Sequence, residues 1–286
     1  MRKIPAILEQ LTGIRLTQSA ITQDALKRAE SAVGEQYRKL RAAVASEEVV
    51  HTDDTGWRVG GKTAFLMAFV NRSLAVYQIR SRHRNEEVRE LIGPDFKGTL
   101  ICDRGKSYDA EALAEVPQQK CLAHLLRNAA EVAEKKTGRA KHFSAKLKEL
   151  LRQALALRSA KAGMSAREYR KQGEALREEL SFHLRHRALR DPGNQALLNG
   201  VGYQDDLGNV LRFLDRDSIE PTNNRAEREL RPAVIARKLS HCSRTRRGAD
   251  AFEAFTSVIQ TIRKNHPARL IEDLAQLIAQ PSAISP

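Results

Sequence analysis

Three acidic residues in three different local settings are the part of this sequence best suited to metal-dependent chemistry. Asp53 ends an apolar run that begins at Val49, and Asp103 ends a second run that begins at Thr99. Glu227 lies in a polar segment typical of a helix start. Carboxylates at two strand ends and on a distant helix can converge on Mg²⁺, which prefers oxygen ligands. Two such ions roughly 3.5–4 Å apart activate a nucleophile and stabilise the leaving oxygen in phosphoryl transfer.

Asp54 competes with Asp53 for the first of these positions. Consecutive strand residues face opposite sides, so only one of the two points into a given site, and sequence parity alone does not choose between them. Each acid also has an ordinary structural interpretation. Aspartate before Thr55-Gly56 is typical of a turn, as is Asp103 at a strand end, and Glu227 suits the first turn of a helix. Their joint placement favours a site.

The chain is strongly basic, which indicates a polyanionic partner. Its 286 residues carry a formal net charge of +14, and nucleic acid is the simplest partner for that charge. A proteome with Arg-rich usage is the alternative explanation.

No apolar run reaches the roughly 18 residues of a membrane helix, and the N-terminus lacks a signal-peptide pattern. Three scattered cysteines do not make a disulfide framework. We predict a cytoplasmic, nucleoid-associated protein with no membrane partner.

Short apolar runs separated by turn residues predict strands in the first half of the chain. Helical periodicity covers 1–48, most clearly Thr22–Ala45. Three antiparallel strands are then expected, followed by a helix with Asn85 as its N-cap and by two more strands. The expected strands are Val49–Thr52, Thr63–Val70, Leu74–Ile79, Leu100–Cys102 and Gln119–Cys121, and the expected helix is Asn85–Ile92.

The strand pattern ends near Ala123, and amphipathic helices are predicted beyond it. One helix carries Phe143 to Leu157, a second carries Tyr169 to Leu184, a turn is expected at 191–193, and 197–214 resumes in helical style. Three helices are expected over 222–280, the first capped by Thr222 or Asn223, with Pro267 between the second and third. The predicted units are an N-terminal helical segment (1–48), a first core part (49–124), a helical insertion (125–215) and C-terminal helices that complete the core (216–286).

This order of elements predicts an α/β fold with a ribonuclease-H-like mixed sheet. In such a core the first and fourth strands lie side by side in parallel, and the helix at 85–92 supplies the crossover that a parallel pair needs. Their terminal carboxylates can then meet, and a later helix supplies the third acid. A helical insertion and C-terminal helices complete the predicted architecture.

Several motifs in the right order resemble the insertion sequence 66 family of bacterial transposases. The segments that carry the resemblance are 53–59 (Asp-Asp-Thr-Gly-Trp-Arg-Val), 102–104 with 107–108, 119–127 with its Cys-x-x-His, 221–228, 230–232 and the tail from 237 to 261. The resemblance implies a DDE transposase in which Asp53, Asp103 and Glu227 are the catalytic residues and hold two Mg²⁺ or Mn²⁺ ions. It further implies cleavage at the ends of a mobile element and strand transfer into target DNA. The family usually has Glu where this chain has Asp54, which leaves Asp54 an auxiliary candidate.

The pair Cys121 and His124 also has the spacing of a zinc motif. A structural zinc site needs four ligands, usually from two such pairs, and the other pair, His241 and Cys242, is adjacent in sequence and poorly spaced. We therefore favour a half-buried helix N-terminus that places His124 near the carboxylates. There it is an auxiliary candidate that contacts a phosphate or orients water, and a satisfied core histidine is the alternative.

Two basic runs flank the three acids and predict contacts to the DNA backbone, which hold DNA without reading its sequence. A solvated charged face is the alternative. Trp57 can stack on an unpaired base or pack over the sheet edge, and Asn223 and Asn224 can cap a helix or contact DNA. The DNA-binding candidates are Trp57, Arg82, Arg84, Asn223, Asn224, Arg228, Arg231, Arg237, Lys238, Arg244 and Arg246.

The expected partners are double-stranded DNA, as terminal repeats and target, and further copies of this chain in a dimer or higher multimer. Family members usually carry upstream DNA-binding modules, whereas this sequence begins just before the catalytic region. We therefore expect a shortened copy, or a chain that relies on accessory proteins of the element for end recognition. Two alternatives to a complete transposase stay open: a ribonuclease-H-like nuclease without strand transfer, and an inactive or regulatory DNA-binding remnant.

Overall fold

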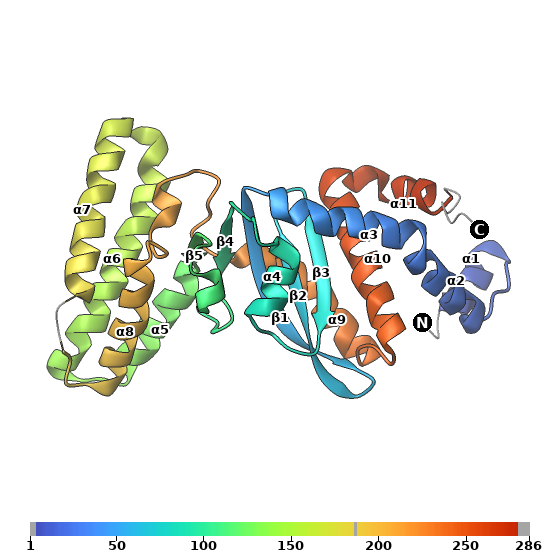
Figure 1. The fold of residues 1–286 in the computed structure, drawn as a ribbon, viewed down its shortest axis with the longest axis horizontal. Helices are drawn as coiled ribbons and strands as arrows, with labels where there is room; N and C mark the ends of the chain where they lie inside the picture. The colour runs from blue at the N-terminus through green and yellow to red at the C-terminus, as the bar shows by residue number, and fades with distance from the viewer. Residues whose placement is uncertain (1–3, 186–187, 280–286) are drawn as a thin grey trace.

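A computed structural model describes residues 4–185 and 188–279 and contains a mixed five-stranded sheet flanked by helices (Figure 1). The strand order is β3-β2-β1-β4-β5, so the ribonuclease-H-like α/β prediction is confirmed. The strands are β1 (Val49–Val59), β2 (Lys62–Val70), β3 (Ala75–Arg80), β4 (Thr99–Cys102) and β5 (Gln118–Lys120). Strands β1, β2 and β3 are antiparallel neighbours, while β4 runs parallel to both β1 and β5.

Strand β1 is much longer than the predicted Val49–Thr52. It continues through Asp53 and Asp54 because these residues pair with Ala68 and Met67 of β2, and the hairpin closes only at Gly60 and Gly61. Both glycines have positive φ, at 58° and 79°. A two-residue hairpin turn with two positive φ values matches the right-handed twist of its strands and favours glycine. The polar residues are therefore part of the strand, not a turn after it.

Helix α4 (Asn85–Ile92) lies between β3 and β4 in the chain and provides the crossover to the parallel pair, as predicted. Its predicted N-cap was wrong by one residue. Arg84 occupies the N-cap position, and its backbone N–H donates to Glu87 Oε2 at 2.9 Å. A glutamate at the third helical position reaches back to the N-cap amide in this way, so Asn85 is free to begin the helix itself.

Helix α10 (Arg246–Asn265) covers the edge of β3 that has no strand partner in the described part of the chain. Residues four apart on a helix are about 6 Å apart along its axis, and alternate residues of a strand are about 6.6 Å apart. Polar side chains repeating every four positions on α10 can therefore follow the free N–H groups of β3. The bonds are Ile79 N to Glu253 Oε1 (2.8 Å), Tyr77 N to Ser257 Oγ (2.9 Å) and Ala75 N to Thr261 Oγ1 (3.1 Å).

The two faces of the sheet are covered by different helices. Helix α9 (Asn224–Ser240) packs Ala226, Leu230 and Ala233 into a cluster with side chains of β2 and β3. Helices α3 (Ala32–Ala43) and α4 pack into a second cluster on the sheet residues of opposite parity. Alternation along each strand therefore sends one set of side chains toward α9 and the other toward α3 and α4.

The N-terminal helical region is divided into α1 (Ile4–Thr12), α2 (Gln18–Glu30) and α3, so the single periodic segment Thr22–Ala45 is broken at Ser31. A Cβ at Gly34 would lie 2.1 Å from Ala29 O, so the glycine permits the close approach at this break.

The helices after the sheet are α5 (Leu122–Glu134), α6 (Lys141–Ala160), α7 (Ala166–Leu184) and α8 (Pro192–Asp206).

Helices α5–α8 share one hydrophobic cluster and lie at one end of the molecule, opposite the N- and C-terminal helices (Figure 1). The cluster contains the predicted stripes of α6 and α7. The expected turn at 191–193 is instead a helix start, because Asp191 Oδ1 accepts from Asn194 N at 2.9 Å and proline suits the first helical position. Helix α8 ends at Asp206, earlier than expected. The boundary of the insertion at 125–215 stays a prediction.

The C-terminal part contains three helices, as expected: α9, α10 and α11 (Leu270–Ala279), with Pro267 between the last two. Gln280, the predicted end of the third, lies outside the described residues. Nowhere in 4–185 or 188–279 is there a helix with the length and apolar character needed to span a bilayer.

Candidate active site

The register of the parallel pair β1 and β4 brings Asp53 and Asp103 to the same level. His51 pairs with Ile101, and each aspartate follows its own strand partner by two residues. Two residues further along β1 restores the same side of the sheet for Asp53, whereas β4 ends at Cys102 and Asp103 lies just past the end of its strand. Asp53 is opposite Ala68, which belongs to the cluster under α9, whereas Asp54 is opposite Met67 on the other face. Sheet geometry thus separates the two aspartates that the sequence left equivalent.

Hydrogen bonds join the three segments that carry the acids. Asn223 Nδ2 donates to Thr52 O at 2.9 Å, next to Asp53. Asn223 N donates to Cys121 Sγ at 3.2 Å, and Cys121 N donates to Cys102 O at 2.9 Å, next to Asp103. These buried hydrogen bonds fix the relative position of the segments that carry them. Asn223 is therefore the N-cap residue of α9 by position, but its side chain holds β1 instead of the helix end.

The surroundings of Asp53 disfavour its charged form. Burial raises the pKa of Asp53 to about 7, and the charges of Asp103, Asp54 and Glu227 add to the increase. A hydrogen bond from the Asp54 backbone acts in the opposite direction. Carboxylates that repel one another in a partly buried site are a common feature of functional centres.

Asp53→Asn is expected to stabilise the metal-free protein at pH 8. The pKa of Asp53 rises from 3.8 to about 7 on folding, so between these values the unfolded chain has lost a proton that the folded protein keeps. Stability therefore falls as pH rises through this window. Asparagine cannot ionise, so the melting temperature of the variant should exceed that of wild type at pH 8, with a smaller difference at pH 5. A difference that stays constant between these pH values would contradict the assigned ionisation.

Asp54 pairs with His83 on the other face of the sheet. His83 Nδ1 lies 3.0 Å from Asp54 Oδ1, and His83 Nε2 lies 3.3 Å from Ser107 Oγ. Burial lowers the pKa of His83, but the hydrogen bond to Asp54 and the nearby carboxylates outweigh it, and the net shift is upward. Asp103 is among those carboxylates. His83 lies between Arg82 and Arg84 in a basic run of the sequence, and its pairing depends on strand parity that this run does not reveal.

The loop after Asp103 is shaped around the carboxylate. Gly105 N donates to Asp103 Oδ1 at 2.8 Å. A Cβ at Gly105 would come within 2.9 Å of the same oxygen, so the glycine is required for this close turn. This hydrogen bond orients the Asp103 side chain.

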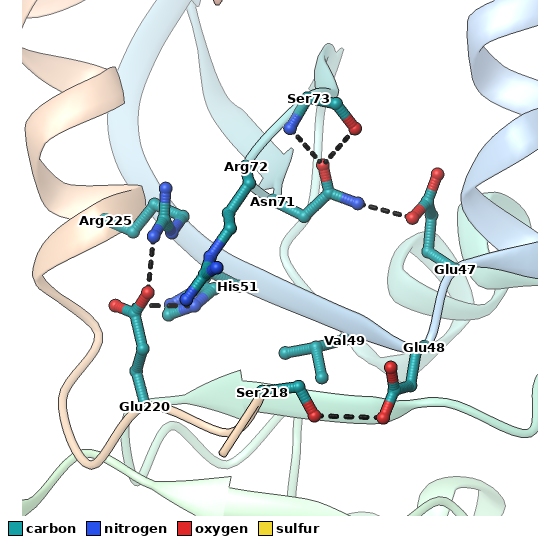
Figure 2. Close-up of a pocket in the computed structure, with 10 residues that line it drawn as sticks. All are labelled: Glu47, Glu48, Val49, His51, Asn71, Arg72, Ser73, Ser218, Glu220 and Arg225. Atoms are coloured by element: carbon teal, nitrogen blue, oxygen red, sulfur yellow. Dashed lines mark hydrogen bonds and ion pairs between the residues drawn. The ribbon is translucent and has the colours of Figure 1, made fainter.

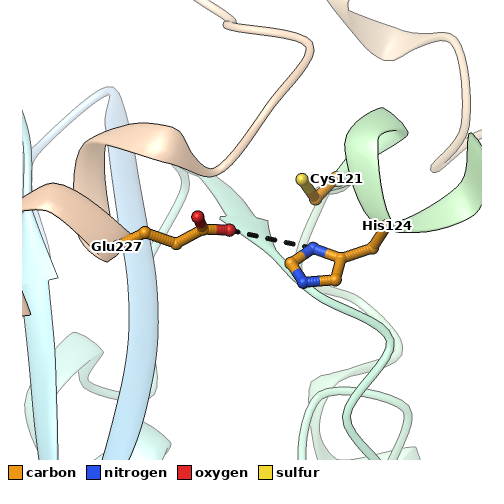
Figure 3. A group of neighbouring side chains, drawn as sticks. All are labelled: Cys121, His124 and Glu227. Carbon is orange, nitrogen blue, oxygen red and sulfur yellow. Dashed lines mark ion pairs between the residues drawn. The ribbon is translucent and has the colours of Figure 1, made fainter. Parts of the chain in front are cut away.

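Glu227 lies in the first turn of α9 and faces Cys121 and His124 at the start of α5 (Figure 3). His124 Nδ1 is 3.9 Å from Glu227 Oε1. His124 therefore lies beside a carboxylate at a half-buried helix N-terminus, as we expected. Burial raises the pKa of the Cys121 thiol, while backbone N–H groups of Asn223, His124 and Ala123 lower it by a smaller amount.

The donor set of the three acids fits hard divalent cations. All three contribute carboxylate oxygens, which Mg²⁺ and Mn²⁺ prefer, and the mutual repulsion that raises the pKa of Asp53 is relieved by a cation. We also looked for any three His, Cys, Asp or Glu side chains whose metal-binding atoms all lie within 4.8 Å of one another. Within the described ranges, one group meets this condition, and it consists of Cys121, His124 and Glu227. Asp53, Asp103 and Glu227 together do not meet this distance condition.

Several DNA-binding candidates have partners within the protein. Trp57 is 3% exposed, its ring centroid lies 4.9 Å from that of Phe252, and its indole N–H donates to Ser243 Oγ, which is the packing alternative. Asn223 is buried. Arg237 donates to Thr55 Oγ1 and Gly56 O. Arg246 pairs with Asp250 and Glu253. These four side chains hold the fold together, and this geometry does not favour DNA contacts for them.

Other candidates are exposed and make no ion pair with any part of the chain that the structure describes. On α9, Arg231 and Lys238 follow Glu227 by four and eleven residues, which places all three on one face of the helix. The exposed candidates are Arg82, Arg84, Asn224, Arg228, Arg231, Lys238 and Arg244. A band of free cations therefore continues from the third acid along α9.

A separate pocket of about 190 Å³ opens beside the first residues of β1 (Figure 2). Burial lowers the pKa of His51 there to about 4, and Glu220 pairs with Arg225. None of the three acids lines this pocket. Its lining residues are Glu47, Glu48, Val49, His51, Asn71, Arg72, Ser73, Ser218, Glu220 and Arg225.

Comparison with known proteins gives one family match. The family model described as "Transposase IS66 family" matches residues 1–251, which includes all three acids and the Cys121–His124 pair. No curated protein matches the chain.

Proposed function

Because the chain belongs to the IS66 family of transposases, we propose that Asp53, Asp103 and Glu227 form its catalytic centre for metal-dependent DNA cleavage and strand transfer. The observation that carries the proposal is the register of the parallel pair β1 and β4, in which His51 and Ile101 are partners two residues before Asp53 and Asp103. Glu227 is proposed to join them from the first turn of α9.

The three carboxylates are proposed to hold two divalent ions. When bound, such ions activate a hydroxyl nucleophile and neutralise charge on the leaving oxygen of the phosphodiester. The protein contributes orientation. Gly105 N fixes one oxygen of Asp103, and Asn223 ties the start of α9 to the backbone beside Asp53. A site held by such neighbours loses little freedom when DNA arrives.

The same centre is proposed to perform two phosphoryl transfers in succession. In the first, water cuts one strand at the end of the element and leaves a 3′-hydroxyl. In the second, that hydroxyl attacks a phosphodiester of target DNA, a new phosphodiester forms, and the target strand is left with its own 3′-hydroxyl. Both reactions exchange one oxygen nucleophile for another at phosphorus, so no redox partner or external energy source is needed.

The exposed cations of α9 are proposed to hold the DNA backbone beside the acids. The double substitution Arg231→Gln and Lys238→Gln removes two free charges on the face that carries Glu227. We expect weaker binding to any DNA sequence and a drop of roughly 2 in the slope of log affinity against log salt. Fluorescence anisotropy over a range of salt concentrations measures both.

Arg247→Gln is the matched control for this experiment. Arg247 is also exposed, but its Nε and Nη2 lie 2.6 and 2.9 Å from the two carboxylate oxygens of Glu30. Its charge is already compensated, so the salt slope should not change. Equal slopes for wild type and the double variant would remove α9 from the DNA-binding surface.

The test of the function is a reaction of the purified chain with plasmid DNA that carries the terminal repeats of its element, in Mg²⁺ or Mn²⁺. Nicks at the repeat ends, followed by products joined to target DNA, are the expected result. Cut ends without joined products would select the nuclease alternative. Salt-sensitive DNA binding without cleavage, by folded protein with either metal, would select the regulatory alternative.

A further inference from the structure

A thiol, an imidazole and a carboxylate meet at the junction of the helical insertion and the catalytic core. The ligand atoms of Cys121, His124 and Glu227 all lie within 4.8 Å of one another (Figure 3). Cys121 is the N-cap residue of α5, His124 lies in the first turn of the same helix, and Glu227 lies in the first turn of α9. Residues from two helices far apart in the sequence therefore converge on one small volume.

The sulfur of Cys121 is already surrounded by hydrogen-bond donors. Asn223 N donates to it at 3.2 Å, and the backbone N–H groups of Ala123 and His124 also lower the pKa of the thiol, against the larger opposing effect of burial. Such donors stabilise a thiolate and orient it as a ligand, as outer partners do in metal sites. The thiol is buried, so this arrangement is not a surface feature exposed to bulk water.

The imidazole of His124 has a buried nitrogen without a partner. Its Nδ1 makes no hydrogen bond with any described residue, and Glu227 Oε1 at 3.9 Å is too distant for one. Buried polar atoms are normally paired, and an exception calls for a specific explanation. A cation between the nitrogen, the sulfur and the carboxylate satisfies all three atoms at once.

We propose that Cys121, His124 and Glu227 bind one Zn²⁺ ion with three protein ligands and one open position. Sulfur and imidazole ligands select zinc over magnesium, and three protein ligands with an open position are typical of non-structural zinc sites. On binding, the Cys121 S–H bond breaks, the thiolate coordinates the ion, and the proton passes to solvent. The four-ligand structural site that the sequence disfavours is not required.

The proposed zinc site shares Glu227 with the proposed catalytic centre. A zinc ion held by the thiol and the imidazole takes this carboxylate away from the ions that Asp53 and Asp103 hold. This consequence rests on the proposed function, and it makes zinc an inhibitor of magnesium-dependent cleavage. The binding site itself does not depend on that function.

Binding is tested with Co²⁺ as a spectroscopic substitute for zinc, titrated into the reduced full-length protein. Wild type should develop a thiolate-to-cobalt charge-transfer absorption that saturates at one ion per chain and disappears when Zn²⁺ is added. Cys121→Ser should lose this absorption, and His124→Ala should weaken binding by at least about tenfold. Circular dichroism confirms that each variant is folded.

Cys242→Ser is the matched control, because Cys242 belongs to the other Cys-His pair and precedes Ser243, which bridges to Val59 at the far end of β1. It should keep the absorption. No absorption in wild type, or an absorption that survives Cys121→Ser in folded protein, would overturn the site.

Inhibition is tested by adding Zn²⁺ to the plasmid-nicking reaction at fixed Mg²⁺, with each variant normalised to its own zinc-free rate. Wild type should be inhibited, and Cys121→Ser should need at least about ten times more zinc. Cobalt binding without zinc inhibition would refute the shared carboxylate and leave the site intact. If no metal supports nicking, the proposed function fails, and the cobalt titration still decides the zinc site.

Discussion

Asp103→Asn is expected to lower metal-dependent nicking by about 1,000-fold, because a cation ligand worth several kcal/mol in the transition state is lost. Asparagine keeps an oxygen at the position that accepts the hydrogen bond of 2.8 Å from Gly105 N. The loop should therefore retain its conformation while the negative charge disappears. The rate of nicking at terminal repeats in Mg²⁺ measures the effect, and circular dichroism and DNA binding should remain close to wild type.

Asp95→Asn is the matched control for this prediction. Asp95 is exposed in the loop before β4 and makes no ion pair with residues in the described ranges, so the same chemical change should leave nicking unchanged. Asp103→Asn protein that binds DNA and nicks at the wild-type rate would show that Asp103 is not a ligand. The centre would then need a different second acid.

Glu253→Ala is expected to reduce the free energy of unfolding by roughly 3–5 kcal/mol, since it removes one partner of a buried ion-pair network. Glu253 is 3% exposed and accepts hydrogen bonds from Ile79 N, Tyr37 and two arginines. Its loss leaves the Ile79 N–H without an acceptor and removes one carboxylate partner from both arginines. Urea unfolding of the metal-free protein, followed by circular dichroism, measures the change.

Asp250→Ala is the internal comparison for this experiment. Asp250 lies on the same helix and pairs with the same Arg246, but its side chain is 56% exposed. Exposed ion pairs contribute at most about 1 kcal/mol, so this variant should remain near wild type. If the two variants were equally stable, the edge of β3 would not depend on the α10 carboxylate.

The sequence alone was sufficient for the order and type of the main elements. Hydrophobic periodicity and turn residues are local signals, and they predicted the antiparallel hairpins, the crossover helix and the helical stripes of α6 and α7. The order of these elements, typical of a ribonuclease-H-like core, also predicted that β1 and β4 are parallel neighbours. Local signals were weaker at boundaries. The N-cap of α4 and the start of α8 were misplaced by the competing capping preferences of neighbouring residues, Glu87 and Asp191.

The tertiary structure decided which of two adjacent aspartates lies on the α9 side of the sheet. Asp53 and Asp54 have the same chemistry and nearly the same sequence surroundings. They differ because β1 pairs with β2 and β4 in one register, and that register sends Asp53 toward α9 and Asp54 toward His83. Strand pairing is a long-range interaction between segments far apart in the chain, so no local pattern contains it.

The tertiary structure also decided which cations are free for a polyanion. The sequence shows a dense basic run from Arg228 to Arg247, but it does not show that Arg246 meets Glu253, that Arg247 meets Glu30, or that Arg237 is held by β1. A side chain's charge is a property of its residue type, whereas its compensation depends on what the fold brings beside it. The residue types were therefore sufficient to indicate a basic protein with three acids, and only the packing of distant elements showed which charges remain available.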